Sequence, residues 1–165
     1  MAWGLPVVGG DASQREASPQ DLRARALRLL ARREHSRAEL RRKLSPHVEE
    51  GIDLEALLDD FTQRGWLSEE RYVEQTVRAK ARKYGPLKIA HHLREKGIDE
   101  AGIESALAQA KAEETEALAS AWRTRFGRMP ADETERAKQV RFLQQRGFAL
   151  EAVLRFLKAE SRSVG

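Results

Sequence analysis

The sequence predicts an all-α protein in which three tandem three-helix repeats, helix-turn-helix-like in outline, stack into an elongated, curved array. A recurring apolar pattern carries this prediction: a hydrophobe follows a glycine, a second comes five residues later, and a third four residues after that. The three copies begin at Gly51, Gly97 and Gly147. A hydrophobic share of 41% beside a charged share of 34% permits only thin core layers, which favours helices over a β-sandwich. Such repeats bury their apolar faces on one another and leave a long surface, which suits binding to a polymer.

Capping signals divide the first repeat, residues 19–67, into three helices. Ser18 followed by a proline predicts the start of the first helix, and Ser36 with Glu39 three residues later predicts a capping box for the second. A Ser-Pro pair then ends the second helix, and Asp53 is predicted to cap the third. Each helix carries a single apolar stripe, so one repeat alone would be only marginally stable and needs its neighbours.

The second and third repeats follow the same pattern. Ser68, the Gly85-Pro86 pair and Asp99 predict the starts of three further helices, and the third repeat is predicted to begin with a separate helix near Glu116. A loop containing Gly, Pro and Asp then leads into its second helix, so we expect nine helices joined by short turns. The expected boundaries are a flexible N-terminal tail at 1–18, repeats at 19–67, 68–113 and 114–160, and a flexible C-terminus at 161–165.

Three aromatic residues have two possible roles each. Trp66 stands where the first repeat is followed by the second, and a wedge between neighbouring repeats is favoured over a platform that stacks on nucleic-acid bases. The same interpretation applies to Trp122 and Phe126, which are four residues apart.

Composition argues against several classes of function. The absence of cysteine excludes disulfides and thiolate metal sites and fits a reducing compartment. No apolar run approaches the roughly eighteen residues that span a bilayer, and the N-terminus lacks a signal-peptide pattern, so we expect a cytoplasmic protein with no membrane partner. The histidines, at positions 35, 47, 91 and 92, lack the spacing of a metal site, and no glycine-rich phosphate loop occurs. We therefore expect no enzymatic activity, no metal and no cofactor.

The net charge of +4 conceals a strong segregation of charge along the chain. Residues 23–43 hold nine bases and two acids, and residues 49–70 hold eight acids and one base. The alternation continues with eight bases against two acids in residues 71–96 and six acids against one base in residues 99–116. This pattern favours a basic ridge directed at a polyanion, with the acidic helices turned elsewhere. The alternative is an ordinary solvated helical surface.

The basic residues of the first two repeats fall on matching helix faces. At 100° per residue, Arg25, Arg28 and Arg32 cluster on the side opposite the apolar stripe of the first helix. Arg71, Arg78 and Arg82 repeat that arrangement in the second repeat. The complete set predicted to bind the partner is Arg25, Arg28, Arg32, Arg33, Arg37, Arg41, Arg42, Lys43, Arg71, Arg78, Arg82, Lys83 and Lys88.

Guanidinium groups bind phosphates or carboxylates through two parallel hydrogen bonds, and each phosphate contact releases counterions. The alternative is that these arginines decorate exposed helices and pair within the chain, as Arg78 could with Glu74. The recurrence of the stripe in two repeats favours binding. It predicts a polyanionic class of partner and no preference for a base sequence.

The trihelical outline of each repeat invites comparison with DNA-binding helix-turn-helix domains. A base-reading module would carry Arg, Asn or Gln near the start of its third helix. The third helices begin instead with acids, such as Asp53 and Glu55 in the first repeat and Asp99 and Glu100 in the second. Acids there would repel the major groove, so sequence-specific readout is not expected.

Four blocks of sequence resemble the RecX family, regulators of the bacterial RecA recombinase. Residues 32–44, with the run RREHSRAEL followed by KL, are similar to its opening signature. Residues 65–73 (GWLSEERYV) resemble its central stretch, residues 83–97 the next block, and residues 142–148 (FLQQRGF) the C-terminal one. The resemblance covers roughly residues 21–157, with an irregular third repeat around residues 127–135.

The resemblance implies a non-enzymatic modulator of RecA, acting in recombination and DNA repair. Members of the family are thought to lie in the helical groove of the RecA–DNA filament and to restrain its ATP hydrolysis and strand exchange. The implied partners are the RecA filament and single- and double-stranded DNA, bound without sequence preference by a monomer. Two alternatives stay open: a free-standing nucleic-acid-binding protein of tandem trihelical units, and a helical adaptor that grips only protein.

Overall fold

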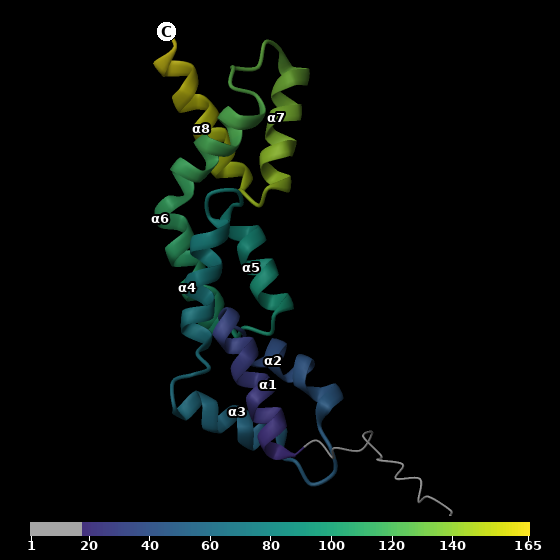
Figure 1. The fold of residues 1–165 in the computed structure, drawn as a ribbon. Coiled ribbons are helices and arrows are strands. Elements are labelled where there is room, and N and C mark those ends of the chain that lie inside the picture. Colours follow the sequence, from purple (N-terminus) through teal and green to yellow (C-terminus); the bar gives the residue numbers. More distant parts are fainter. Residues whose placement is uncertain (1–17) are drawn as a thin grey trace, which may run out of the picture.

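A computed structural model describes residues 18–165 of the chain, and this range is helical with no strand. The predicted N-terminal tail, apart from Ser18, lies outside the described residues. Figure 1 shows an elongated stack of helices in which α7, α5 and α2 follow one another along the length of the molecule. In chain order the elements are α1 (Pro19–Arg32), α2 (Arg37–Leu44), the 3₁₀ turn η1 (Ser45–His47), α3 (Leu54–Gln63), α4 (Glu69–Lys80), α5 (Pro86–Glu95), α6 (Glu100–Arg125), α7 (Glu133–Gln145) and α8 (Leu150–Ser163).

Side-chain caps begin most of these helices at the predicted residues. Ser18 and Asp21 form a reciprocal capping box at α1, and the side chains of Asp53, Ser68 and Asp99 each accept a hydrogen bond from the backbone N–H three residues on. These bonds satisfy amides that have no partner inside the helix. Helix α8 extends to Ser163, so helical structure enters the C-terminal segment expected to be flexible.

Three separate hydrophobic clusters confirm the three-repeat interpretation. Each cluster is built from three helical segments, and the recurring pattern supplies its central members, among them Phe61, Ile103 and Val153. The first cluster draws on α1, α2 and α3, the second on α4, α5 and the first half of α6, and the third on the rest of α6 with α7 and α8. Each repeat therefore has its own core, and the repeats meet at two joints.

The second and third repeats share one helix. The expectation of nine separate helices is wrong within the described residues, because α6 runs unbroken through Glu116, where a new helix was expected to begin. Residues 104–121 contain no proline or glycine and are rich in Ala and Glu, which propagate a helix well. Ala106 at one end of α6 packs in the second core and Leu118 in the third, so the helix is a continuous strut between them.

The aromatic residues do not act as wedges between repeats. Leu67 enters the first core, while the neighbouring Trp66 remains 40% exposed and packs edge-on against Phe61 of its own repeat. Trp122 is buried within the third core and donates a hydrogen bond to Gln139, and Phe126 packs on that same core.

Both joints between repeats use the second helices in the same way. The C-terminal end of the second helix in one repeat abuts the N-terminal end of the second helix in the repeat before it. At the first joint, the Ser36 hydroxyl donates to the Lys96 carbonyl at 2.7 Å. At the second, the backbone N–H of Gly85 donates to the Arg146 carbonyl at 2.8 Å. Head-to-tail placement of this kind sets the positive end of one helix dipole against the negative end of the next.

A glycine in the left-handed region makes each of these contacts possible. Gly97 has φ +78° and Gly147 has φ +94°, and each directly follows the residue whose carbonyl crosses the joint. A Cβ on Gly97 would meet the Cβ of Ala38 at 2.6 Å, and one on Gly147 would meet the backbone nitrogen of Lys88 at 2.6 Å. A Cβ on the equivalent Gly51, with φ +84°, would have nothing within 4 Å among the described residues.

Substituting these glycines separates backbone strain from joint packing. Gly51→Ala and Gly147→Ala impose a similar left-handed strain, which costs about 1–2 kcal/mol. Only Gly147→Ala also drives a methyl group into the backbone of α5, so we expect a total loss of about 3 kcal/mol or more. Urea unfolding followed by far-UV circular dichroism measures both. Equal losses for the two variants would contradict the tight second joint.

Candidate functional site

The thirteen basic residues predicted to bind a partner divide into two groups. Five are tied to carboxylates inside the protein: Arg33, Arg37, Arg41, Lys43 and Arg71. Seven are exposed and have no carboxylate partner among residues 18–165, namely Arg25, Arg28, Arg32, Arg42, Arg78, Arg82 and Lys83. The remaining one, Lys88, lies at the second joint. The expectation that the acidic helices turn away from the basic ones is wrong for the first repeat, because α3 faces α2.

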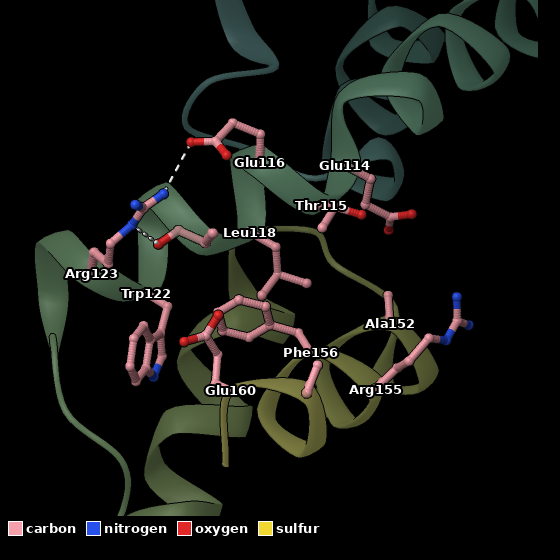
Figure 2. Close-up of a pocket in the computed structure, with 12 residues that line it drawn as sticks. Glu114, Thr115, Glu116, Leu118, Trp122, Arg123, Ala152, Arg155, Phe156 and Glu160 are labelled. Carbon is pink, nitrogen blue, oxygen red and sulfur yellow. Dashed lines mark hydrogen bonds and ion pairs between the residues drawn. The ribbon is translucent and has the colours of Figure 1, made fainter. Parts of the chain in front are cut away.

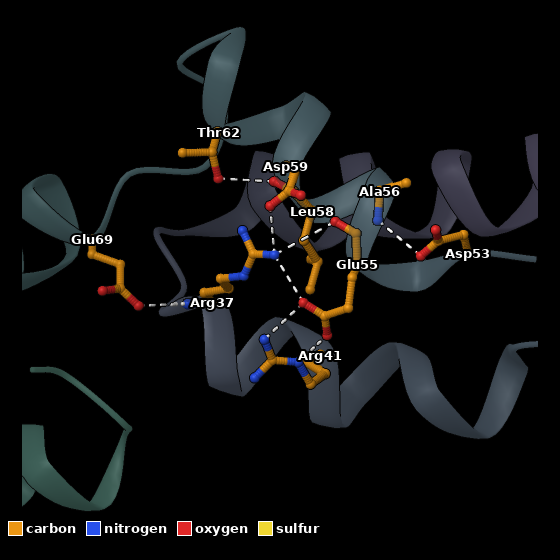
Figure 3. A network of polar contacts seen from close by, with 9 residues as sticks. All are labelled: Arg37, Arg41, Asp53, Glu55, Ala56, Leu58, Asp59, Thr62 and Glu69. Atoms are coloured by element: carbon orange, nitrogen blue, oxygen red, sulfur yellow. Dashed lines mark hydrogen bonds and ion pairs between the residues drawn. The ribbon is translucent and has the colours of Figure 1, made fainter.

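Helix α3 neutralises the arginines of α2. Figure 3 shows Arg37 and Arg41 pointing from α2 towards Glu55 and Asp59 on α3. Arg37 lies 2.8 Å from Glu55 and 2.7 Å from Asp59, and Arg41 donates to Glu55 through two nitrogens. The hydrogen bonds from Arg41 and Arg37 lower the pKa of Glu55 to about 2. These two arginines therefore fasten α2 to α3, and carboxylates of the same repeat compensate most of their charge.

A buried carboxylate organises the first joint. The side chain of Glu39 is 3% exposed and accepts two hydrogen bonds from Arg33, the longer at 3.1 Å, while Lys43 lies 3.6 Å away. Burial, the largest influence, raises the pKa of Glu39, but the hydrogen bond and charge of Arg33 with the charge of Lys43 bring it to about 2. The predicted capping box is thus only half formed: Ser36 caps the amide of Glu39, whose carboxylate is engaged by Arg33.

The buried His35 beside this carboxylate has a defined tautomer. Its Nδ1 lies 3.0 Å from the Arg33 carbonyl, which can only accept, so Nδ1 carries the proton. Its Nε2 is then free to accept from the Lys43 ammonium at 3.2 Å. Burial lowers the pKa of His35, which keeps the ring neutral at physiological pH.

Arg71 holds the first joint from the side of the second repeat. Its Nε donates to Glu34 at 2.8 Å, and its Nη2 donates to the Gly65 carbonyl at 2.7 Å. Although Arg71 belongs to the predicted stripe of α4, its donors are engaged within the chain. Arg78, Arg82 and Lys83 at the other end of that helix remain exposed.

The arginine stripe of α1 is the clearest exposed basic feature. Arg25, Arg28 and Arg32 span about 10 Å along the helix, on an exposed side about a quarter-turn from the buried Leu22 and Ala26. Arg25 and Arg28 line one hollow between α1 and the η1 turn. Their guanidinium donors have no carboxylate partner among the described residues and are available to an external anion.

The third repeat contains a hollow of a different character. It opens between α6 and α8, where Figure 2 shows Leu118, Trp122 and Phe156 on its floor and charged side chains on its rim. Trp122 and Phe156 pack edge to face at 5.5 Å, and the rim residues Glu116 and Arg123 pair at 3.0 Å. The hollow is the open edge of the third core. Residues 18–165 contain no group of His, Asp or Glu placed to hold a metal ion.

Models of three RecX domains match the chain in order. The first three-helix domain matches residues 23–51, the second residues 68–107 and the third residues 112–157. The chain belongs to the RecX family. These matches follow the repeats seen in the fold, and the last two lie on either side of the middle of α6.

Curated RecX proteins resemble the chain over most of its length. "Regulatory protein RecX" of Ralstonia nicotianae is 45% identical over 140 residues, which cover 85% of this chain and 88% of that protein. The protein of the same name from Leptothrix cholodnii is 45% identical over 83% of this chain and 87% of its own length. The fold is also similar to that of a crystal structure of RecX from Lactobacillus salivarius, with a TM-score of 0.74 at 20% identity, covering 86% of this chain and 95% of that one. No described helix is long and apolar enough to cross a membrane.

The fold adds basic residues that the sequence stripe did not include. Lys80 at the end of α4 and Arg146 after α7 lie beside Lys88 at the second joint, around the ring of Tyr84. The only available signal was the alignment of repeats, which places Arg146 at the position of Lys96. No property of Arg146 in the linear sequence distinguishes it from other surface arginines.

The first joint makes stability sensitive to acid in two steps. In the folded protein the pKa of His35 is below its ordinary 6.5. As pH drops below about 6.5, His35 is therefore protonated more readily in the unfolded chain than in the folded protein, and the free energy of unfolding falls. The folded pKa of Glu39 is about 2 against an ordinary 4.5, so its contribution is present above about 4.5 and is lost as pH falls towards 2. Urea unfolding between pH 7.5 and 3 measures both steps.

The variant Glu39→Gln isolates the second step. At pH 7 we expect it to unfold about 2–3 kcal/mol more easily than the parent protein, because Arg33 loses a charged partner at a buried site. The difference should shrink as pH falls below 4.5. The matched control is Glu151→Gln, which removes an exposed carboxylate paired with Arg155 and should change little. A difference that stays constant down to pH 3 would exclude Glu39 as the titrating group.

Proposed function

We propose that this protein binds along the RecA–DNA filament, occupies its groove, and restrains ATP hydrolysis and strand exchange without catalysing a reaction of its own. Membership of the RecX family supports RecA as the partner. The elongated stack supports a binding mode that extends along a polymer. The observation that carries most weight is the exposed stripe of Arg25, Arg28 and Arg32, whose donors have no carboxylate partner among residues 18–165.

The two groups of basic residues have different roles in this proposal. Arg33, Arg37, Arg41, Lys43 and Arg71 maintain the first repeat and the first joint, and so act on binding only through the fold. The exposed residues of α1, with Arg42 on α2 and Arg78, Arg82 and Lys83 near the end of α4, supply the electrostatic attraction. Because phosphate contacts release counterions, this attraction weakens as salt rises.

Reversing the charge of the α1 stripe tests the proposal. Relative to the parent protein, Arg25→Glu, Arg28→Glu and Arg32→Glu together should lower filament affinity at least tenfold. The slope of log affinity against log salt should fall in magnitude by about 2, as expected for three lost contacts to a single strand. Helix content should not change, because the face is exposed. Fluorescence anisotropy of labelled filaments over a range of salt concentrations gives both quantities.

The control variant reverses three exposed arginines of the third repeat, Arg136, Arg155 and Arg162. It makes the same change in net charge and leaves the α1 stripe intact. If the two triple variants lost filament affinity equally, the effect would come from net charge and not from the α1 stripe. An unchanged affinity and salt slope in the α1 variant would remove those arginines from the interface.

RecA ATP turnover on single-stranded DNA distinguishes the proposal from its alternatives. Inhibition at molar ratios well below those needed to coat the DNA supports action on the filament. Inhibition only at DNA-saturating amounts supports a free-standing nucleic-acid-binding protein. The absence of both inhibition and DNA affinity supports a protein-only adaptor.

A further inference from the structure

Three cations surround one aromatic ring at the second joint. The Lys80 ammonium lies 5.6 Å from the centroid of the Tyr84 ring, the Lys88 ammonium 4.7 Å, and the Arg146 guanidinium carbon 5.5 Å. They come from the end of α4, the first turn of α5 and the end of α7, so the stacking of the second and third repeats brings them together. The Tyr84 ring is partly buried, and it is attracted to cations through its quadrupole.

Among residues 18–165, no ion pair balances the charge of this cluster. None of the three cations has a carboxylate partner within residues 18–165, and the only polar contact described for their side chains is a 3.4 Å bond from Lys88 to the Gln145 carbonyl. Lys88 also sits in the first turn of α5, the positive end of that helix dipole, which is an unfavourable place for a cation. The negative C-terminal end of α7 offsets part of this cost, because Lys88 donates to the Gln145 carbonyl there, and an anion bound at the site would offset more.

The first joint provides an internal comparison with the same backbone geometry. Ser36 and Gly85 are the equivalent N-cap residues, so Glu39 and Lys88, three residues on, occupy equivalent positions. At the first joint the buried Glu39 pairs with Arg33 and lies 3.6 Å from Lys43. The second joint carries a cation at that position, and Lys80, Lys88 and Arg146 have no carboxylate paired with them within residues 18–165.

The neighbouring histidine responds to this positive field. Burial is the main cause of the lowered pKa of His92, and the charges of Lys80 and Lys96 lower it further. His92 lines an open hollow with Lys80, Tyr84 and Lys88, and Arg146 lies outside this lining. The hollow also holds Glu95, whose carboxylate lies 3.3 Å from His91. Helix termini account for part of the arrangement, since Lys80 and Arg146 lie at the negative ends of α4 and α7. The same end of α7 also faces Lys88, whose ammonium donates to the Gln145 carbonyl.

We propose that Lys80, Lys88 and Arg146, gathered around Tyr84 at the joint between the second and third repeats, bind phosphates of a nucleic-acid backbone. The phosphates would fill the role that Glu39 plays at the first joint, and binding there would also clamp the second and third repeats together. A flexible phosphate backbone fits the open, shallow hollow and needs no shape-matched partner surface. This inference deepens the proposed function and rests on it for the identity of the polymer.

Direct binding to DNA in the absence of RecA tests this site. The probe is a fluorescently labelled oligodeoxythymidine, and anisotropy gives the affinity of the full chain at several salt concentrations. We expect Lys88→Gln with Arg146→Gln to weaken binding about tenfold. The magnitude of the salt slope should fall by about 1.4, or 0.7 for each of two lost phosphate contacts. The matched control is Lys111→Gln with Arg162→Gln, two exposed cations away from the joint, which should bind nearly as the parent protein does.

A second variant tests whether weaker DNA binding could result from a disturbed joint and not from the loss of a phosphate contact. Arg146 and Lys88 contact both repeats, whereas Lys80 reaches the ring from α4 and makes no described bond to α7. Lys80→Gln should therefore weaken DNA binding without lowering the unfolding temperature. Lys88→Glu, which restores the carboxylate found at the first joint, should weaken binding more than Lys88→Gln does.

The outcomes separate this inference from the proposed function. Loss of DNA affinity in the joint variants but not in the control supports the phosphate site. Normal DNA affinity in the joint variants, with loss in the α1 variant, overturns the site and leaves the proposed function standing. If the parent protein inhibits RecA but binds no oligonucleotide, and the joint variants lose that inhibition, the site takes acidic protein side chains and the assignment to phosphate is wrong.

Discussion

The structure depends on a head-to-tail contact between second helices that occurs twice. A carbonyl at the end of α5 or α7 meets a donor at the start of the second helix in the preceding repeat, and a left-handed glycine beside that carbonyl lets the backbones approach. Each contact aligns two helix dipoles and satisfies groups that would otherwise have no partner. A three-helix unit of this size buries too little apolar surface to be stable alone. The joints and the shared helix α6 add the contacts between repeats that stabilise one elongated molecule.

The joints also decide which basic residues are available to a partner. At the first joint and within the first repeat, Glu34, Glu39, Glu55 and Asp59 bind arginines that would otherwise face solvent. The arginines therefore form two groups, those paired with carboxylates inside the protein and those left exposed. Exposure alone does not separate them, since both Arg71 and Arg78 are exposed, and the distinction lies in which guanidinium has a carboxylate within reach.

The sequence predicted the helices well because their signals are local. Ser18, Asp53, Ser68 and Asp99 cap helices where expected, since a cap needs only a side chain and the amide three residues away. The continuous α6 was missed because the repeat pattern suggested a break that the composition of residues 104–121 does not support. Trp66 was misplaced for a different reason: its position in the chain is between repeats, but its packing partner Phe61 lies in the first.

The sequence by itself determined the fold class and the three cores, because apolar periodicity survives in the linear chain. The polyanionic class of partner stays a prediction from the charge pattern. Only the tertiary structure decided which charges are free. Salt bridges such as Arg71 with Glu34, and clusters such as Lys80, Lys88 and Arg146, join residues separated by tens of positions, and their pairing depends on distances of a few ångströms set by the joints. The sequence gives the sign of each charge, but the stacking of the repeats decides which opposite charge lies within ion-pair distance.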